Sequence, residues 1–253
     1  DALMELLVMI HAAKHASAHR IIAVTPWYGY SRQDKKSAPP EPISPRLVAE
    51  VLETAGFHRL VTMDLHAGQM QGFFSKPVDH MTAMPILTQF VADQLAGEDL
   101  VIIAPDAGRV KLVRKFAQKV GAPYALLEKE RPSHQVAEIG YVIGDVKGKV
   151  AVIVDDIIDT GGTLSAAAQT VLDEGASKVY AVATHGVFSG RAFETLEASP
   201  LAGIVVTDTV PLRDGAPDRI RVLTSADILT DSIRRIFLDD SVSEIFEGEN
   251  QLF

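Results

Sequence analysis

Cysteine is absent from this sequence of 253 residues. Without thiols there can be no disulfide framework, no thiolate zinc site and no cysteine nucleophile. Any metal ion must therefore be held by oxygen or imidazole ligands. The lack of cysteine also fits a reducing compartment, and we expect a cytoplasmic protein.

Positive charge and long apolar runs are also scarce. Lys and Arg number 24 against 33 Asp and Glu, giving a formal net charge of −9, and nucleic-acid binding needs clustered cations. The N-terminal apolar stretch, residues 2–10, is interrupted by Glu5 and is too short to span a bilayer. We therefore expect neither a nucleic acid nor a membrane as a partner.

Hydrophobic residues make up 47% of the chain and recur in short β-branched runs. Such runs are typical of buried parallel strands, and segments with helical spacing lie between them. The alternation predicts an α/β protein with two doubly wound parallel sheets. The expected strands are 20–26, 59–65, 100–106, 149–156, 178–185 and 203–209, and the expected helices include 2–16, 44–55, 110–120 and 163–174.

The expected domain boundaries follow from this alternation. Residues 1–81 together with about 236–253 would form an N-terminal-type domain, and 82–235 a C-terminal domain. Because the chain opens in a helix with no strand before it, we expect the N-terminal sheet to be incomplete. The spacing of His11, His15 and His19 along that helix favours a solvated surface over a metal site.

The segment VIVDDIIDTGGT, residues 152–163, combines a buried strand, paired carboxylates and a glycine turn before a helix. Small residues let backbone N–H groups approach a phosphate, and the helix N-terminus favours negative charge. Asp155 and Asp156 would accept vicinal sugar hydroxyls, directly or through Mg²⁺. The alternative is a plain strand end, with Asp159 capping the helix.

The whole string resembles the phosphoribosyl pyrophosphate (PRPP) signature shared by type I phosphoribosyltransferases and PRPP synthases. This resemblance implies a type I phosphoribosyltransferase-like fold for both domains. It also implies that the paired acids contact ribose and that the turn holds the 5-phosphate. The residues so assigned are Asp155, Asp156, Asp159, Thr160, Gly161, Gly162 and Thr163.

Three further segments distinguish a synthase from a transferase. YSRQDKK with EPIS (30–36 and 41–44), DLHAGQMQGFF (64–74) and PDAGRV (105–110) resemble the landmarks of the ribose-phosphate pyrophosphokinase family, in the same order. The resemblance implies transfer of pyrophosphate from ATP to ribose 5-phosphate with Mg²⁺. By the same resemblance Arg32 and Gln33 bind ATP, His66 lies at the ATP phosphates and holds the metal, and Asp106 is a second metal ligand.

The segment EKERPSHQ, residues 128–135, is charged and lacks apolar periodicity, which predicts a mobile loop. The family carries a Lys-x-Arg pair on a flexible catalytic loop at this place, and Lys129 and Arg131 match it. Their cations would stabilise charge on the phosphate oxygens during in-line attack by the anomeric hydroxyl on the β-phosphorus.

The chain departs from the family in two places. The family's N-terminal strands are not present, and Ala38, Pro39 and Pro40 stand where many members have arginines that bind regulatory phosphate or ADP. The resemblance implies a homo-oligomer, a hexamer built from dimers. Two alternatives stay open: a type I phosphoribosyltransferase, and a catalytically silent regulatory subunit of the same family.

Overall fold

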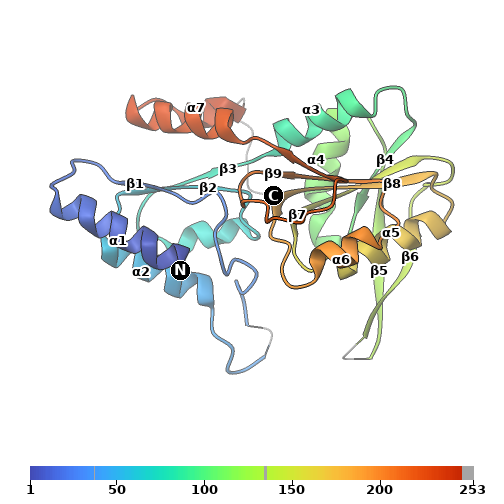
Figure 1. Ribbon diagram of the computed structural model, residues 1–253, viewed down its shortest axis with the longest axis horizontal. Helices are drawn as coiled ribbons and strands as arrows, with labels where there is room; N and C mark the ends of the chain where they lie inside the picture. Colours follow the sequence, from blue (N-terminus) through green and yellow to red (C-terminus); the bar gives the residue numbers. More distant parts are fainter. Residues whose placement is uncertain (37, 134–135, 247–253) are drawn as a thin grey trace. The chain divides into compact units, whose positions relative to one another are not determined.

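The computed structural model describes all residues except 37, 134–135 and 247–253 (Figure 1), and between 129 and 139 it describes the backbone alone. The chain forms two compact units. Unit 1 contains Asp1–Thr82 and the segment that begins at Ile228, and unit 2 contains Ala83–Asp227. Unit 2 is therefore one continuous stretch of sequence that interrupts unit 1.

Unit 1 is built on a small parallel sheet in the order β1-β2-β3. Figure 1 shows helices α1 and α2 on one face of this sheet and α7 on the other. The core on the α1 and α2 side includes Ile10, Leu52, Phe57 and Leu60, each no more than 3% exposed. The elements before unit 2 are α1 (Ala2–His15), β1 (Ile22–Val24), α2 (Ser44–Ala55), β2 (Arg59–Met63), a 3₁₀ helix η1 (Gly68–Phe73) and β3 (Val78–Met81).

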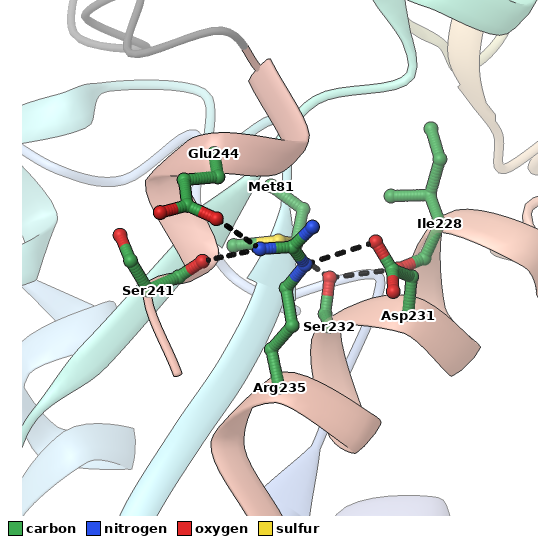
Figure 2. A network of polar contacts seen from close by, with 7 residues as sticks. All are labelled: Met81, Ile228, Asp231, Ser232, Arg235, Ser241 and Glu244. Atoms are coloured by element: carbon green, nitrogen blue, oxygen red, sulfur yellow. Dashed lines mark hydrogen bonds and ion pairs between the residues drawn. The ribbon is translucent and has the colours of Figure 1, made fainter. Parts of the chain in front are cut away.

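Helix α7 (Ala226–Phe237) and the 3₁₀ helix η3 (Val242–Phe246) complete unit 1. Figure 2 shows Arg235 of α7 joined to Asp231, to the carbonyl of Ser241 at 3.0 Å and to Glu244 at 2.8 Å. The buried Ser232 hydroxyl lies 2.9 Å from the Met81 sulfur of β3. These contacts hold both C-terminal elements within unit 1.

Unit 2 contains a seven-stranded sheet in the order β10-β9-β8-β7-β4-β5-β6. All neighbouring pairs are parallel except β5 and β6, which form an antiparallel ribbon. Its strands are β4 (Leu100–Ala104), β5 (Tyr124–Ser133), β6 (Val136–Ile143), β7 (Val150–Ile158), β8 (Lys178–Gly186), β9 (Gly203–Thr207) and β10 (Ile220–Leu223).

Helices cover both faces of this sheet. α3 (Met84–Gln94) and α4 (Val110–Val120) lie on one face, and α5 (Gly162–Asp173) and α6 (Ala192–Glu197) on the other (Figure 1). The fully buried side chains of Ala168, Val171 and Leu196 pack on the β-strand core. Because β4 and β7 are adjacent and parallel, the turns after these strands meet at one edge of the sheet.

The predicted α/β class with parallel sheets is confirmed, and the runs at 59–65, 100–106, 149–156, 178–185 and 203–209 all contain strands. The prediction of a loop at 128–135 was wrong for residues 128–133, which belong to β5. Strand pairing uses backbone N–H and C=O groups, so a polar sequence does not prevent it. Pro132, which has no N–H, falls in the register irregularity between Glu130 and Ser133. Residues 134–135 lie outside the described part.

Within the described residues, no helix is both long and apolar enough to cross a bilayer.

Candidate active site

The segment that runs from the end of β7 into the first turn of α5 carries all seven residues predicted to bind ribose 5-phosphate. Asp155 and the buried Asp156 lie near the end of β7, and Asp159 follows the strand. Thr160, Gly162 and Thr163 are exposed around the first turn of α5, whereas Gly161 is buried. The sequence therefore brings two carboxylates and a helix N-terminus together within one short segment.

Arg109 bridges the two carboxylates. It is the last residue of the 3₁₀ helix η2 (Ala107–Arg109) and the N-cap of α4, beyond the end of β4. Its Nε atom is 3.1 Å from Asp155 Oδ1, and its Nη2 atom is 2.7 Å from Asp156 Oδ1. Sequence reasoning missed this residue, although it belongs to the PDAGRV segment. The planar guanidinium suits two acceptors at once, because its N–H donors form a rigid fork.

The environment of Asp155 opposes its negative charge. Burial raises the pKa of the Asp155 carboxyl well above its usual value, and the charge of the adjacent Asp156 raises it further. The Arg109 guanidinium acts in the opposite direction and lowers that pKa. The backbone N–H of Asp156, which donates to Asp155 Oδ1 at 2.8 Å, also favours the ionised form. Arg109 is thus the cation that offsets the cost of two adjacent acids.

Glycine is required by the structure at position 161 but not at position 162. Gly161 has φ 78°, and a Cβ there would come within 2.9 Å of the Leu196 side chain. Both backbone and packing therefore require glycine at this position. A Cβ on Gly162 would meet no atom within 4 Å. Packing therefore does not require glycine at position 162. The space beside this residue, at the N-terminus of α5, is open.

A second turn contacts the segment that joins β7 to α5. The Ser189 hydroxyl, in the turn after β8, donates to Asp159 Oδ1, and the Arg213 guanidinium donates to the carbonyl of Phe188. The N-cap residue of α5 is Gly161, which has no side chain with which to cap the helix. Neither Ser189 nor Arg213 was predicted as a site residue.

Asp106, a predicted metal ligand, follows β4 at the same edge of the sheet in unit 2. Its Oδ1 would lie 3.1 Å from a Cβ on Gly108, so this glycine leaves room for the carboxylate. In the described part of the chain no three His, Cys, Asp or Glu side chains form a metal-binding group. The residues therefore do not form an all-protein metal cage.

The predicted ATP residues belong to unit 1. Arg32 is exposed in the loop between β1 and α2, and the Gln33 side chain reaches Glu41 Oε2 at 3.4 Å. Gln69 of η1 donates to Asp34 of the same loop at 3.3 Å. His66 is partly exposed between β2 and η1. The loop and the DLHAGQ segment thus contact each other within unit 1.

His80 supports the turn that carries His66. Its Nε2 atom accepts the backbone N–H of Leu65 at 2.8 Å, so its other ring nitrogen carries the proton of the neutral form. Asp64 has a positive φ of 38° at the same turn. The structure therefore adds a supporting histidine that the sequence did not identify.

Lys129 and Arg131 both lie in β5, where Lys129 pairs with Ile139 of β6. Their side chains are outside the described part of the structure. Their predicted catalytic roles remain a prediction.

Comparisons with known proteins show which family the chain belongs to. Residues 1–56 match the model for the N-terminal domain of ribose phosphate pyrophosphokinase, and residues 117–247 match the phosphoribosyl synthetase-associated domain. A ribose-phosphate pyrophosphokinase from Caldanaerobacter subterraneus is 51% identical over 96% of this chain and 78% of that protein. The corresponding protein from Clostridium acetobutylicum is 49% identical over 98% of this chain and 79% of its own length.

The solved structures give the same result. The crystal structure of phosphoribosylpyrophosphate synthetase from Mycobacterium smegmatis matches with a TM-score of 0.87 and 44% identity, over 94% of this chain and 78% of that one. Both family models, and the matches that cover nearly all of this chain, agree with the order of motifs along the sequence. This chain belongs to the ribose-phosphate pyrophosphokinase family.

Proposed function

We propose that this chain transfers the β,γ-diphosphoryl group of ATP to ribose 5-phosphate, giving AMP and PRPP. The anomeric oxygen attacks the β-phosphorus in line, the bond from that phosphorus to the oxygen bridging the α- and β-phosphates breaks, and the hydroxyl proton passes to solvent. The observation that carries this proposal is the loop after β7, where Asp155, Asp156 and the N-terminus of α5 lie together. The ribose-phosphate pyrophosphokinases matched at about half identity support the same activity.

In this proposal the two ends of ribose 5-phosphate bind to different parts of that loop. The sugar hydroxyls donate to Asp155 and Asp156, and backbone N–H groups and hydroxyls of residues 159–163 hold the 5-phosphate. Gly162 supports this assignment, since the space beside it is open although the loop around it is packed. The phosphate would also interact favourably with the α5 dipole.

Members of this family use a metal ion, and we propose Mg²⁺ for this chain. Mg²⁺ is usually bound by one or two protein ligands together with substrate phosphates and water, so a site without a three-residue cluster fits it. Asp106 would supply a carboxylate oxygen and His66 an imidazole nitrogen. When bound, the ion would neutralise charge on the phosphate oxygens of ATP.

We assign the remaining roles, ATP binding and stabilisation of the transferred group, to residues of unit 1 and of β5. Arg32 and Gln33 would bind ATP, with the guanidinium suited to a phosphate or an adenine face and the amide to the base edge. Lys129 and Arg131 would stabilise the charge that develops during transfer. These four assignments rest on the family resemblance of their segments.

The same proposal includes a homo-oligomer that works in the cytoplasm. Large apolar side chains are exposed on both N-terminal helices, including Met4 and Val8 on α1 and Leu47 on α2, each more than 60% exposed. Such side chains are more typical of subunit interfaces than of solvated surface. Light scattering coupled to size exclusion would give the mass, and a monomer at assay concentration would contradict this part.

The activity is tested by ³¹P NMR of the purified chain with Mg²⁺, ATP and ribose 5-phosphate. The expected products are AMP and a diphosphate ester at C1 of the sugar, and Asp156→Ala should form them more slowly because it binds ribose 5-phosphate more weakly. A chain that binds ribose 5-phosphate and ATP without turnover, but raises the activity of a catalytic relative, would instead be a regulatory subunit. PRPP consumption with a free base would identify a phosphoribosyltransferase.

A further inference from the structure

The ion pairs of Arg109 point to a role in ribose recognition beyond the residues already assigned. The guanidinium contacts Oδ1 of each carboxylate, Asp155 and Asp156, and its side chain is only 16% exposed. A carboxylate has two oxygens and about four lone-pair sites, so one that pairs with arginine can still accept other hydrogen bonds. The arginine and a sugar can therefore use the same two acids together.

Charge balance explains why the site needs this cation. Asp156 is 5% and Asp155 is 30% exposed in the side chain, and ribose hydroxyls bring no charge with which to offset them. Two adjacent carboxylates without a cation would hold a proton between them, and one acceptor for the sugar would be lost. A fixed guanidinium favours the ionised form of Asp155, whose pKa it lowers, and fixes the orientation of both acids.

We propose that Arg109 is a positioning residue for ribose 5-phosphate, holding Asp155 and Asp156 side by side as acceptors for the sugar hydroxyls. This inference rests on the proposed function, because it assumes that these acids bind the sugar. It requires that loss of Arg109 weaken sugar binding selectively. The KM for ATP should change little, and kcat at saturating sugar should fall less than kcat/KM.

The experiment compares Arg109→Gln and Arg109→Lys with Arg114→Gln, which removes the same charge from the exposed face of α4. We expect Arg109→Gln to raise the KM for ribose 5-phosphate roughly tenfold or more, because the ion pairs that hold the two acids are lost. Lysine should restore part of the loss, and Arg114→Gln should match the wild type. Thermal melts of each variant establish that it is folded.

Two other outcomes have distinct meanings. A folded Arg109→Gln enzyme with an unchanged or lower KM for ribose 5-phosphate overturns the positioning role. If the glutamine variant does not fold, Arg109→Lys decides, and an equal rise in KM for both substrates overturns it. Asp156→Ala is measured alongside, because an unchanged sugar KM there would refute the ribose site itself rather than the role of Arg109.

A separate observation on α1 carries a second inference. His11 and His15 are both exposed, one helical turn apart, and their Nε2 atoms lie 3.1 Å apart. Two nitrogens that bind one metal at about 2.0–2.1 Å lie roughly 3 Å from each other. Histidines at i and i+4 on one helical face form such a pair in zinc enzymes. The solvated surface expected here from sequence thus contains two converging imidazoles.

We infer that His11 and His15 form a two-ligand surface site for a borderline transition-metal cation, with water as the remaining ligands. Within the described residues no third side chain completes a metal-binding group there, so binding should be weak and reversible. Affinity should follow the order Cu²⁺ above Zn²⁺ for nitrogen ligands. Mg²⁺ prefers oxygen, so this site is distinct from the metal requirement of the reaction.

Isothermal titration of the full chain with ZnCl₂, without an affinity tag, tests this site. We expect one event that disappears in His11→Ala and in His15→Ala but persists in His19→Ala, which lies beyond the end of α1. Binding retained in both single variants overturns the inference. So does a wild-type chain with no zinc event, which would leave a plain N–H···N hydrogen bond between the rings.

Discussion

The hydroxyl of Ser189 donates a hydrogen bond to the carboxylate of Asp159, and so links the turn after β8 to the turn after β7. We expect Ser189→Ala to raise the KM for ribose 5-phosphate several-fold, because Asp159 loses the donor that fixes its orientation. Steady-state kinetics with each substrate varied in turn measure the effect.

Ser199→Ala is the matched control for this variant. The Ser199 hydroxyl donates to the Leu196 carbonyl at the end of α6 and is also buried. Removing it should lower stability by about 1 kcal/mol without a selective change in sugar binding. Equal kinetic effects of the two variants would contradict the proposed role of Ser189.

Gly162→Ala should weaken the binding of ribose 5-phosphate without lowering the stability of the fold. The added methyl meets no atom within 4 Å, and alanine favours a helix more than glycine does. We therefore expect an unchanged or slightly higher Tm, together with a clear rise in the KM for ribose 5-phosphate. Gly161→Ala should instead lower the Tm, since its φ of 78° and the nearby Leu196 both disfavour a side chain. An alanine at 162 with wild-type kinetics would count against the phosphate assignment.

Asp155→Asn should change how stability depends on pH. Burial raises the pKa of Asp155 in the folded chain above its unfolded value, so the folded state binds the proton more tightly. Wild-type stability therefore falls as pH rises from the unfolded pKa, about 3.9, through the folded pKa. Asparagine does not titrate, so the Tm difference in favour of the variant should grow over that window. Differential scanning calorimetry across pH without substrate would test this, and a difference that does not vary with pH would refute it.

Arg235→Gln should weaken the attachment of η3 to α7. The arginine contacts Asp231, Glu244 and the Ser241 carbonyl, but these groups are partly exposed, so the effect should be small. We expect a fall in Tm of no more than about 4 °C, with faster proteolysis after residue 238. Arg234→Gln, on the exposed face of α7, is the control and should behave as the wild type.

The helices and strands that were predicted correctly are those indicated by a short stretch of their own sequence. β7 and α5 were found because a buried β-branched run leads directly into Gly161 and Gly162, and that segment also carries the proposed ribose-binding residues. Strands β3, β6 and β10 were missed. In β10 only Ile220 is buried, so the strand has no long apolar run to reveal it. The polar end of β5 was read as a loop for the same reason.

The contacts that organise the site are long-range, and this is why they were not predicted. Arg109 meets Asp155 across two neighbouring strands, and Ser189 meets Asp159 across another pair. A single sequence records which residues have suitable chemistry, but not which partners the sheet order brings together. His80 shows the same limitation, because its role depends on the pairing of β2 with β3.

The interruption of unit 1 by unit 2 sets an order for folding during synthesis. Arg20 contacts the Ile236 carbonyl and Asp239, partners more than 200 positions later in the chain. While the ribosome is still making that C-terminal segment, the nascent unit 1 lacks α7 over its sheet, whereas unit 2 is already continuous and can fold. The face of β3 that Ser232 covers in the folded chain is thus uncovered until α7 has been made.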